Sequence, residues 1–300
     1  MDYLGIIKRS YHISIKNKFL WIFGILAGGA AGFKGLNLNS VNYSTGSADW
    51  NKFSSSLNSY DWASFWDKFA LTILGVMLFI LIFAVVMFVL NIISQGALVG
   101  SVDKLDKNEK ANFKIGFGIG WHQFWRIWGM ALTYLAMILA SLVVMVAPVV
   151  VAIVFSNYIF AVIWGCLLLL VCLIFWILIG LISPYSLRVI VLEKYGIWQS
   201  IRESLHLFRD HWIEVILIYL LLIAISLGFA IAVGLGLLLI GGLLLLVGYG
   251  AWLASSLAAV IYGVVAGLGF FILIVIVSGA FNAFYSAAIT LTYQKLTRKS

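Results

Sequence analysis

The sequence predicts an all-α, polytopic integral membrane protein with about six transmembrane helices. Of its 300 residues, 64% are hydrophobic and only 10% are charged, and the mean hydropathy is +1.10. A soluble core does not need so much apolar chain, whereas a multi-span membrane protein does. The apolar residues also form long runs without charge, of which residues 215–294 are the longest. That run is too long for one membrane crossing and long enough for two or three.

The first 33 residues predict a helix on the membrane surface, followed by a first membrane helix. Five large apolar residues share one helical face, as in an interfacial helix: Tyr3, Leu4, Ile7, Tyr11 and Ile15. The apolar run at 19–33 is marginal for a crossing unless its helix begins earlier, so a re-entrant hairpin stays open. Basic residues before it also imitate a signal peptide, but a retained helix is favoured because the rest of the chain is membrane-embedded.

Residues 34–68 predict an extracytoplasmic loop. They are rich in Asn and Ser, and their three Lys balance their three Asp. Four aromatic residues at helical spacing lead from this loop into a second span at 69–94, and they are typical of an interfacial aromatic belt: Trp62, Phe65, Trp66 and Phe69.

Polar chain returns at residues 95–126 and precedes two charge-free spans at 127–149 and 158–183. The glycines from Gly116 to Gly120 lack the spacing and the flanking residues of a nucleotide-binding loop. No nucleotide cofactor is therefore predicted.

Residues 184–214 contain every charged residue that lies between Arg126 and Lys295. Pro184 can occupy the first turn of a new helix, where its missing N–H is unpaired in any case. From Ile197 the spacing predicts an amphipathic helix, which should lie along the membrane surface because hydrophobic spans flank it. Its apolar arc consists of Ile197, Trp198, Ile201, Leu205, Phe208 and Trp212.

The opposite side of this helix is polar and consists of Gln199, Arg202, Glu203, His206, Arg209 and Asp210. His206 has Arg202 and Asp210 one turn away on either side, so the three could bind a lipid phosphate. They could equally form a solvated helix face, which is the interpretation we favour. The candidate surface for lipid or a protein partner comprises Trp198, Arg202, His206, Arg209 and Trp212.

The charge-free run after Glu214 predicts a fifth helix at 212–234 and a sixth at 255–285 that continues to Lys295. A glycine-rich continuation or partial hairpin would lie between them, so the number of helices in 212–255 stays open. Two glycine series have the spacing that permits close helix packing, within one chain or between chains: Gly24, Gly28 and Gly32, and Gly263 and Gly267.

The charge distribution predicts a multi-pass protein of the cell membrane with both termini in the cytoplasm. The N-terminal segment, residues 95–126 and the tail after residue 292 carry net positive charge, whereas residues 34–68 and 149–158 are neutral. Positive and neutral segments thus alternate as six spans require, and the positive ones belong inside. Residues 184–214 carry four basic and four acidic residues, so parity rather than charge places them inside.

Three spans end in similar runs, each with a small residue, an apolar stretch and an acid or amide before Lys: residues 96–105, 186–195 and 287–296. These runs predict an internal repeat of three hairpins within a single membrane domain, residues 1–300. Chance similarity between membrane sequences is the alternative. The repeat units would be residues 1–94, 95–183 and 184–300.

Residues 183–185, 191–196 and 200–209, which precede a span that begins with Trp, carry a family resemblance. They resemble the membrane domain associated with some glycerophosphoryl diester phosphodiesterases and related bacterial proteins, and Lys18–Leu26 and Tyr293–Leu296 add to the likeness. The resemblance implies a multi-span bacterial membrane domain. It does not imply phosphodiesterase activity, because the catalytic barrel of that enzyme would be a separate soluble domain. Tyr293-Gln294 departs from the acidic ending of such proteins.

The sequence shows no set of residues for catalysis or metal binding. Cys166 and Cys172 point to different sides of one helix, which argues against a disulfide. The predicted spans lack ionisable residues other than Cys and Tyr, whereas ion-coupled transporters commonly place a charge in the membrane. Six polar residues of the spans are expected to form helix–helix hydrogen bonds: Asn91, Thr133, Ser141, Ser226, Ser278 and Asn282.

These observations favour a non-enzymatic integral membrane protein without cofactors that organises lipid or a protein partner through cytoplasmic interfacial helices. The partners would be membrane lipid and either another protein or a second copy of the chain. Nucleic acid is not expected, because the basic residues flank apolar runs, where they set topology or meet anionic lipid. The alternative is a transporter or flippase for a neutral or amphipathic solute.

Overall fold

The computed structural model describes residues 2–28, 62–154 and 158–297. All regular secondary structure in these ranges is α-helical, which confirms the predicted all-α class. The predicted loop at 34–68 and its aromatic belt lie largely outside the described part. The helices are α1 (Tyr3–Lys16), α2 (Phe19–Gly28), α4 (Trp62–Asp106), α5 (Phe113–Val154), α6 (Tyr158–Glu193), α7 (Ile197–Asp210), α8 (Trp212–Ala254) and α9 (Ser256–Thr297).

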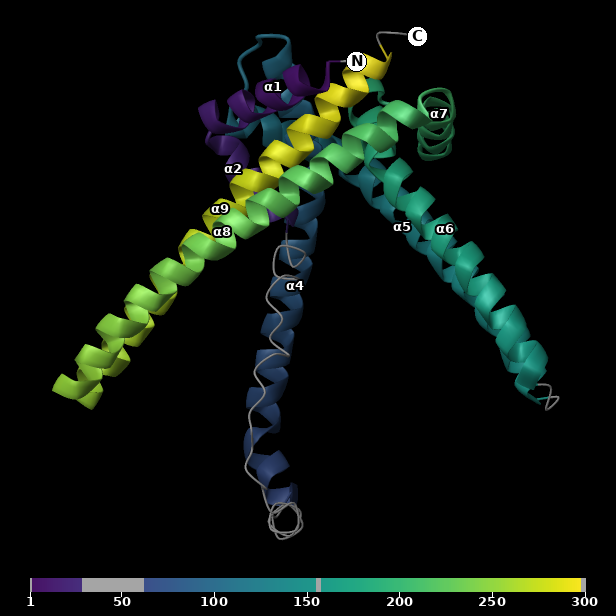
Figure 1. Ribbon diagram of the computed structural model, residues 1–300. Helices are drawn as coiled ribbons and strands as arrows, with labels where there is room; N and C mark the ends of the chain where they lie inside the picture. Colours follow the sequence, from purple (N-terminus) through teal and green to yellow (C-terminus); the bar gives the residue numbers. More distant parts are fainter. Residues whose placement is uncertain (1, 29–61, 155–157, 298–300) are drawn as a thin grey trace.

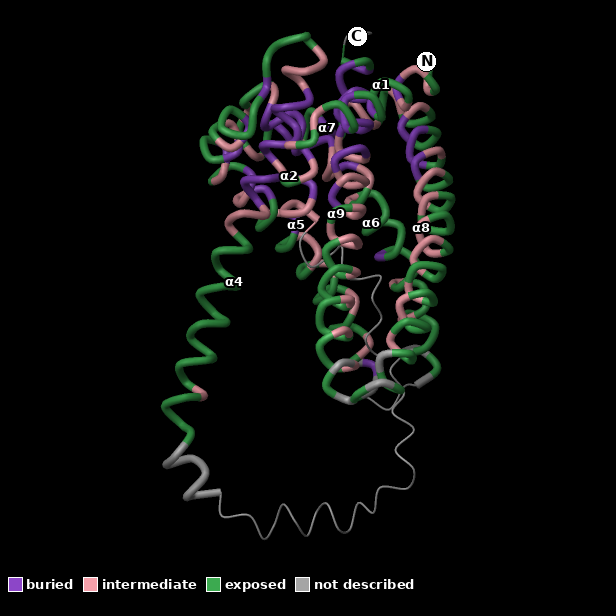
Figure 2. Tube along the Cα trace, turned by 90° about the vertical axis from the view of Figure 1, so that its left-hand side faces the viewer, coloured by how far each residue is buried: buried purple, intermediate pink, exposed green. Residues whose placement is uncertain are grey.

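The long helices form three legs that diverge from a common head (Figure 1). One leg is α4, the second is the antiparallel pair α5 and α6, and the third is the antiparallel pair α8 and α9. The head consists of α1, α2, α7 and the ends of the long helices beside them. Both α1 and the C-terminal end of α9 lie in the head. Buried residues concentrate there, whereas the legs are largely exposed (Figure 2).

Five of the described helices are long and apolar enough to cross a membrane, which confirms a polytopic membrane protein. The predicted first span is represented by α2, which has ten residues and ends at Gly28, so whether the chain crosses or re-enters there stays a prediction. The apolar part of α8 has 39 residues, or about 58 Å at 1.5 Å per residue. Because a bilayer core is about 30 Å thick, a helix of this length must either tilt strongly or extend beyond the hydrocarbon region.

The helix break expected at Pro184 is absent, so that prediction was wrong, and of the two alternatives left open for the glycine-rich segment the continuous helix is found. Pro184 lies inside α6 and does not begin a new helix. The glycine-rich segment from Gly234 to Gly250 lies inside α8, so residues 212–254 form a single helix. Lipid offers the backbone no alternative hydrogen-bond partners, and a continuous helix therefore persists through Pro and Gly that would end it in water.

Close helix packing occurs at the predicted Gly24 and Gly28. A Cβ atom on Gly24 would overlap the Gly279 carbonyl oxygen of α9, and one on Gly28 would overlap the Asn282 side chain. Gly32 lies outside the described residues. Neither Gly263 nor Gly267 has a described atom within 4 Å of a Cβ position, so any packing they provide is not against this part of the chain.

Asparagine side chains satisfy the C-terminal end of α2. The last carbonyl groups of a helix have no partners within it, and leaving them unpaired in an apolar environment is costly. The Asn91 amide donates to the carbonyl oxygens of Leu26 and Ala27 at 2.9 and 2.8 Å, and the Asn282 amide donates to that of Gly24 at 3.3 Å. These two asparagines form the expected helix–helix hydrogen bonds.

The other polar residues of the spans divide into two groups. Ser141 of α5 accepts a hydrogen bond from the indole N–H of Trp176 in α6 at 2.9 Å. Thr133 and Ser226 instead donate to carbonyl groups of their own helices. Only part of the predicted set therefore links helices.

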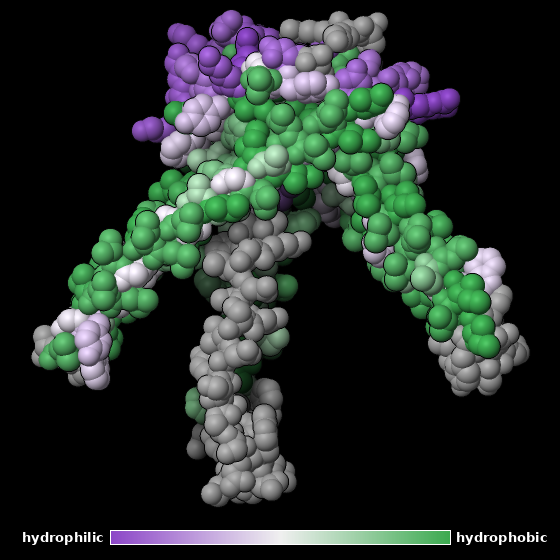
Figure 3. All heavy atoms as spheres, in the orientation of Figure 1, coloured by the Kyte–Doolittle hydropathy of each residue, from purple (hydrophilic) through white to green (hydrophobic). Residues whose placement is uncertain are grey.

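Charge separates the head from the far ends of the legs. Fourteen described Lys and Arg residues and eight described Asp and Glu residues lie in the head, whereas the described start of α4, at the far end of its leg, contains Asp67 and Lys68. Figure 3 shows hydrophilic residues gathered over the head and hydrophobic ones along the leg of α5 and α6 and the leg of α8 and α9. The molecule thus has one polar end and three apolar legs.

We predict that Gly24→Ala lowers the free energy of unfolding by about 1–3 kcal/mol, because the added methyl group forces α2 away from α9. Gly267→Ala is the matched control, since it adds the same group in open space on α9. Thermal unfolding of both variants in detergent micelles tests this, and equal midpoints for the two variants would contradict it.

Candidate functional site

The apolar side of α7 divides into a packed edge and an exposed edge. Ile197 and Ile201 pack against the hydrophobic core formed by α4, α5 and α6. Trp198 and Leu205 are 72% and 54% exposed, and Trp212, at the start of α8, is 53% exposed. The predicted arc is therefore not one face with one role: one edge attaches α7 to the head, and the other leaves large apolar side chains uncovered.

The two arginines of the polar side are its members nearest to this exposed apolar edge. At 100° per residue, Arg209 and Arg202 follow Trp198 at about 20° and about 40° around the helix, and both are exposed. His206 lies further round, where its Nδ1 is 2.8 Å from the Asp210 carboxylate. Of the exposed apolar residues and the two arginines, four lie on one side of α7, and Trp212 follows at the start of α8; together they are here called the α7 surface: Trp198, Arg202, Leu205, Arg209 and Trp212.

Helix α1 is built in the same way. Leu4, Tyr11 and Ile15, three residues of its predicted interfacial face, are 76%, 59% and 46% exposed. Ile6 and Ile13, which do not fit that face, are buried in the head core. Ile6 and Ile13, which lie off the interfacial face, are thus the residues that attach α1 to the head core.

Small residues let α1 and α7 approach the head closely. Ser10 and Ser14 of α1 and Ser200 and Ser204 of α7 are all buried, four residues apart in each helix. Three of these hydroxyl groups donate to a carbonyl group four residues earlier, and that of Ser14 donates across to the Ala280 carbonyl of α9 at 3.3 Å. Hydroxyl groups bonded in this way can face a packed surface without an unpaired donor.

Glycines take the same role at the start of α5. A Cβ atom on Gly116 would lie 2.5 Å from the Ser101 hydroxyl of α4, and one on Gly120 would overlap the Ile93 carbonyl of α4. These glycines belong to a helix, and their spacing of four serves close packing.

Helix α1, the start of α5 and helix α7 each pack on a helix of a neighbouring leg, so that the three contacts link the legs in a cycle. Helix α1 packs on α9, the start of α5 packs on α4, and α7 packs on α6. Each therefore rests on the last helix of a different leg. Among the described residues, the arrangement fastens the three legs to one another at the head.

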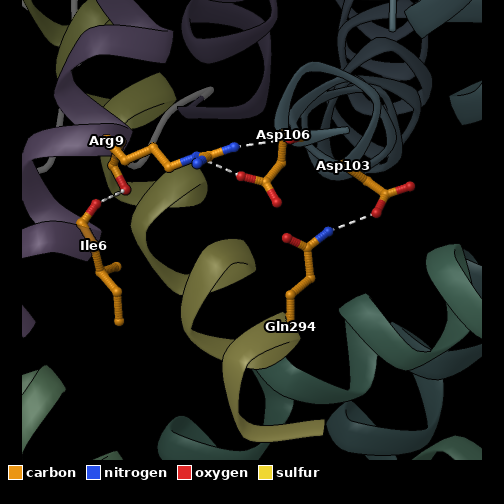
Figure 4. A network of polar contacts seen from close by, with 6 residues as sticks. Ile6, Arg9, Asp103, Asp106 and Gln294 are labelled. Carbon is orange, nitrogen blue, oxygen red and sulfur yellow. Dashed lines mark hydrogen bonds and ion pairs between the residues drawn. The ribbon is translucent and has the colours of Figure 1, made fainter. Parts of the chain in front are cut away.

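The three similar sequence runs also meet in the head. Their acid or amide positions are Asp103, Glu193 and Gln294 at the ends of α4, α6 and α9. The Gln294 amide donates to Asp103 at 2.5 Å (Figure 4), and the Tyr293 hydroxyl donates to Glu193. The internal repeat stays a prediction, but in space its three runs end side by side.

An ion pair joins helix α1 to the end of α4, where the three runs meet. Arg9 Nε lies 2.6 Å from the Asp106 carboxylate, and Arg9 Nη2 donates to the Asp106 carbonyl at 2.8 Å (Figure 4). The end of α4 is therefore held by α9 on one side and by α1 on the other.

The residues at the third position of each of the three runs line a cavity of about 300 Å³ in the head. They are Leu98, Arg188 and Ile289, one from each run. Further lining residues come from α2, α4, α5, α6 and α9, among them Gln95 and Asn282. The cavity thus lies where the last helices of all three legs come together.

Arg188 is the one charged residue among those that line this cavity, and it is only 4% exposed. Its Nη1 donates to the Pro184 carbonyl at 2.6 Å, and its Nη2 lies 3.3 Å from both the carbonyl and the hydroxyl oxygen of Ser286. Its Nε has no hydrogen-bond partner among the described residues. All these acceptors are neutral, and the described part of the chain provides no ion pair for Arg188.

The sequence reasoning missed this residue. Arg188 was counted within a polar connector, whereas it lies inside the continuous helix α6 and is buried in the head. A signal for it was present in the three similar runs. When the three runs are aligned on their acid or amide, Arg188 corresponds to Leu98 and Ile289. A charged residue at a position that is aliphatic in the other two runs is the signal.

Comparison of the chain with protein-family models, with curated proteins and with solved structures gives no match. The arguments about function therefore rest on the residues themselves. Among the described residues, no group of three or more His, Cys, Asp or Glu side chains is placed to hold a metal ion.

We predict that Ser204→Leu detaches α7 from α6, because a buried small side chain is replaced by one that the contact cannot hold. Amide hydrogen exchange in α7 should become faster while exchange in α9 stays unchanged. Gln199→Leu adds the same side chain at an exposed position of α7 and should leave exchange as it is. Equal protection of α7 in the two variants would show that the contact does not depend on a small residue.

Proposed function

We propose that the protein is a non-enzymatic integral protein of the cell membrane that organises anionic lipid at the cytoplasmic face. Helices α1 and α7 would lie at the lipid headgroups, with the three legs in the hydrocarbon region. Both termini would then be cytoplasmic.

The observation that carries this proposal is the α7 surface. Tryptophan side chains favour the membrane interface, where an apolar ring can be buried beside polar headgroups. Arginine forms charge-assisted hydrogen bonds with phosphate. In the α7 surface, Trp198 and Leu205 are exposed directly beside Arg209 and Arg202, so one surface can bury apolar side chains and bind phosphate at the same time.

The charge of the head supports its cytoplasmic location. Fourteen Lys and Arg against eight Asp and Glu give the described head a clear positive charge. Positive segments beside membrane helices are retained on the cytoplasmic side and are attracted to the anionic lipids of that leaflet.

The lipid contact of α7 can be tested with single cysteines in full-length protein whose Cys166 and Cys172 are replaced by Ser. A fluorophore on Leu205→Cys should be quenched by nitroxide-labelled lipid, since Leu205 lies on the exposed apolar edge. A fluorophore on Glu203→Cys, on the polar side, is the control and should be quenched much less. Equal quenching at the two sites would refute an interfacial α7.

The organisation of anionic lipid can be tested with Arg202→Gln/Arg209→Gln. Membrane patches extracted around this variant in polymer discs should contain less anionic lipid than patches around the wild type, because two phosphate-binding cations are lost. Lys194→Gln, an exposed basic residue outside the α7 surface, is the control and should leave the lipid composition nearly unchanged. An unchanged lipid ratio around the double variant would refute the proposal.

The second candidate is a transporter or flippase. Its sequence argument included a glycine-rich break, and α8 is continuous there. The observation that favours it is the cavity between helices of all three legs. Lipid scrambling by reconstituted vesicles would support this candidate over the first one.

A further inference from the structure

We propose that the cavity at Arg188 binds the phosphate of an anionic lipid headgroup, which brings no ammonium group to offset its negative charge. This site is separate from the α7 surface and does not depend on it. The ligand would be a phosphate ester carried by a lipid of the same leaflet as the head.

The first argument is the missing counter-charge. Arginine stays protonated in proteins, and burying its guanidinium group is costly unless an anion compensates it. Here the bonded acceptors, Pro184 and Ser286, are neutral, and Nε has no described partner. The ionisable side chains near Arg188 are Tyr185, Tyr219 and Tyr285, and their phenol groups are neutral near pH 7. A phosphate would supply both the opposite charge and the missing acceptor.

The second argument is that the fold does not need a cation at this position. Leu98 and Ile289 occupy the corresponding positions of the other two runs, line the same cavity, and pack as ordinary aliphatic residues. An aliphatic residue in place of Arg188 would avoid the cost of burying a charge. A residue that is costly for the fold and placed in a cavity is more readily explained by binding than by stability.

The third argument concerns the shape and chemistry of the cavity. Its volume of about 300 Å³ holds a headgroup and is too small for two acyl chains as well. Ser286 bonds to Arg188, Gln95 and Asn282 also contribute polar lining, and Leu98, Met130 and Ile289 supply apolar lining. An amphiphile matches this mixed lining better than a free ion does.

The position along α6 identifies the source of the phosphate. Arg188 lies five residues before the end of α6 at Glu193, or about 7–8 Å along the helix axis. Polar lining residues such as Gln95, Asn282 and Ser286 are only partly buried, so the cavity can be reached from outside. A headgroup bound there would leave its acyl chains beside the apolar legs, which expose their side chains to lipid (Figure 3).

The test is thermal unfolding of the full-length protein in a neutral detergent with added lipid. Phosphatidylglycerol should raise the midpoint above that measured with phosphatidylcholine by about 5 °C, the shift expected for one ligand at about a hundred times its dissociation constant. Arg188→Leu should remove most of this difference, and Arg188→Lys, which keeps the charge, should retain part of it. Lys194→Gln, an exposed basic residue outside both the cavity and the α7 surface, is the control and should retain the full difference.

Three results would overturn the proposal. One is equal stabilisation of the wild type by the two lipids, and another is a full lipid preference in a folded Arg188→Leu variant. The third is stabilisation by inorganic phosphate as large as that by phosphatidylglycerol, which would make free phosphate the ligand. Since Arg202→Gln/Arg209→Gln should keep the Arg188-dependent shift, failure of the α7 surface and failure of this site are distinguishable.

Discussion

The structure depends on close contacts between small residues in the head. Gly24 packs against Gly279, Gly120 against the backbone of α4, and the buried serines of α1 and α7 against the long helices beside them. In lipid, apolar side chains gain little by leaving an already apolar solvent, so helices associate where small residues allow tight packing and hydrogen bonds. The head has these contacts, and large parts of the legs lack them. The legs therefore diverge, and their side chains remain exposed.

The same physics explains which features the sequence could predict. Composition and charge-free length predicted the membrane class, and the 3.6-residue period predicted a helix from Ile197, where α7 begins. The break expected at Pro184 is absent, and the glycine-rich segment of α8 continues as a helix, because the usual cost of these residues assumes that water competes for the backbone. Periodicity also cannot separate an edge that packs on the protein from an edge that remains exposed, since both are apolar. Only the fold shows that Ile201 belongs to the first and Leu205 to the second.

The position of Arg188 shows a further limit of sequence reasoning. Its neighbours along the chain suggested a polar connector, but the ends of three helices that are distant in the sequence surround it. The carbonyl of Ser286, 98 residues away, is one of its acceptors. Burial of this kind arises from long-range contacts and has no local pattern, although the correspondence of Leu98, Arg188 and Ile289 was already present in the three runs.

The correspondence of Leu98, Arg188 and Ile289 shows that the fold requires a side chain at this position of each run but does not require a charged one. A threefold arrangement of helix ends explains why one residue of each run lines the cavity, and two aliphatic residues satisfy this role. If Arg188 served to hold the helices together, an acidic residue facing it would be the simplest partner, as Asp106 is for Arg9. Neutral acceptors and an unpaired Nε are found instead. A cation that the described chain leaves uncompensated calls for an anion from outside, and in a protein surrounded by lipid the nearest phosphate is that of a headgroup.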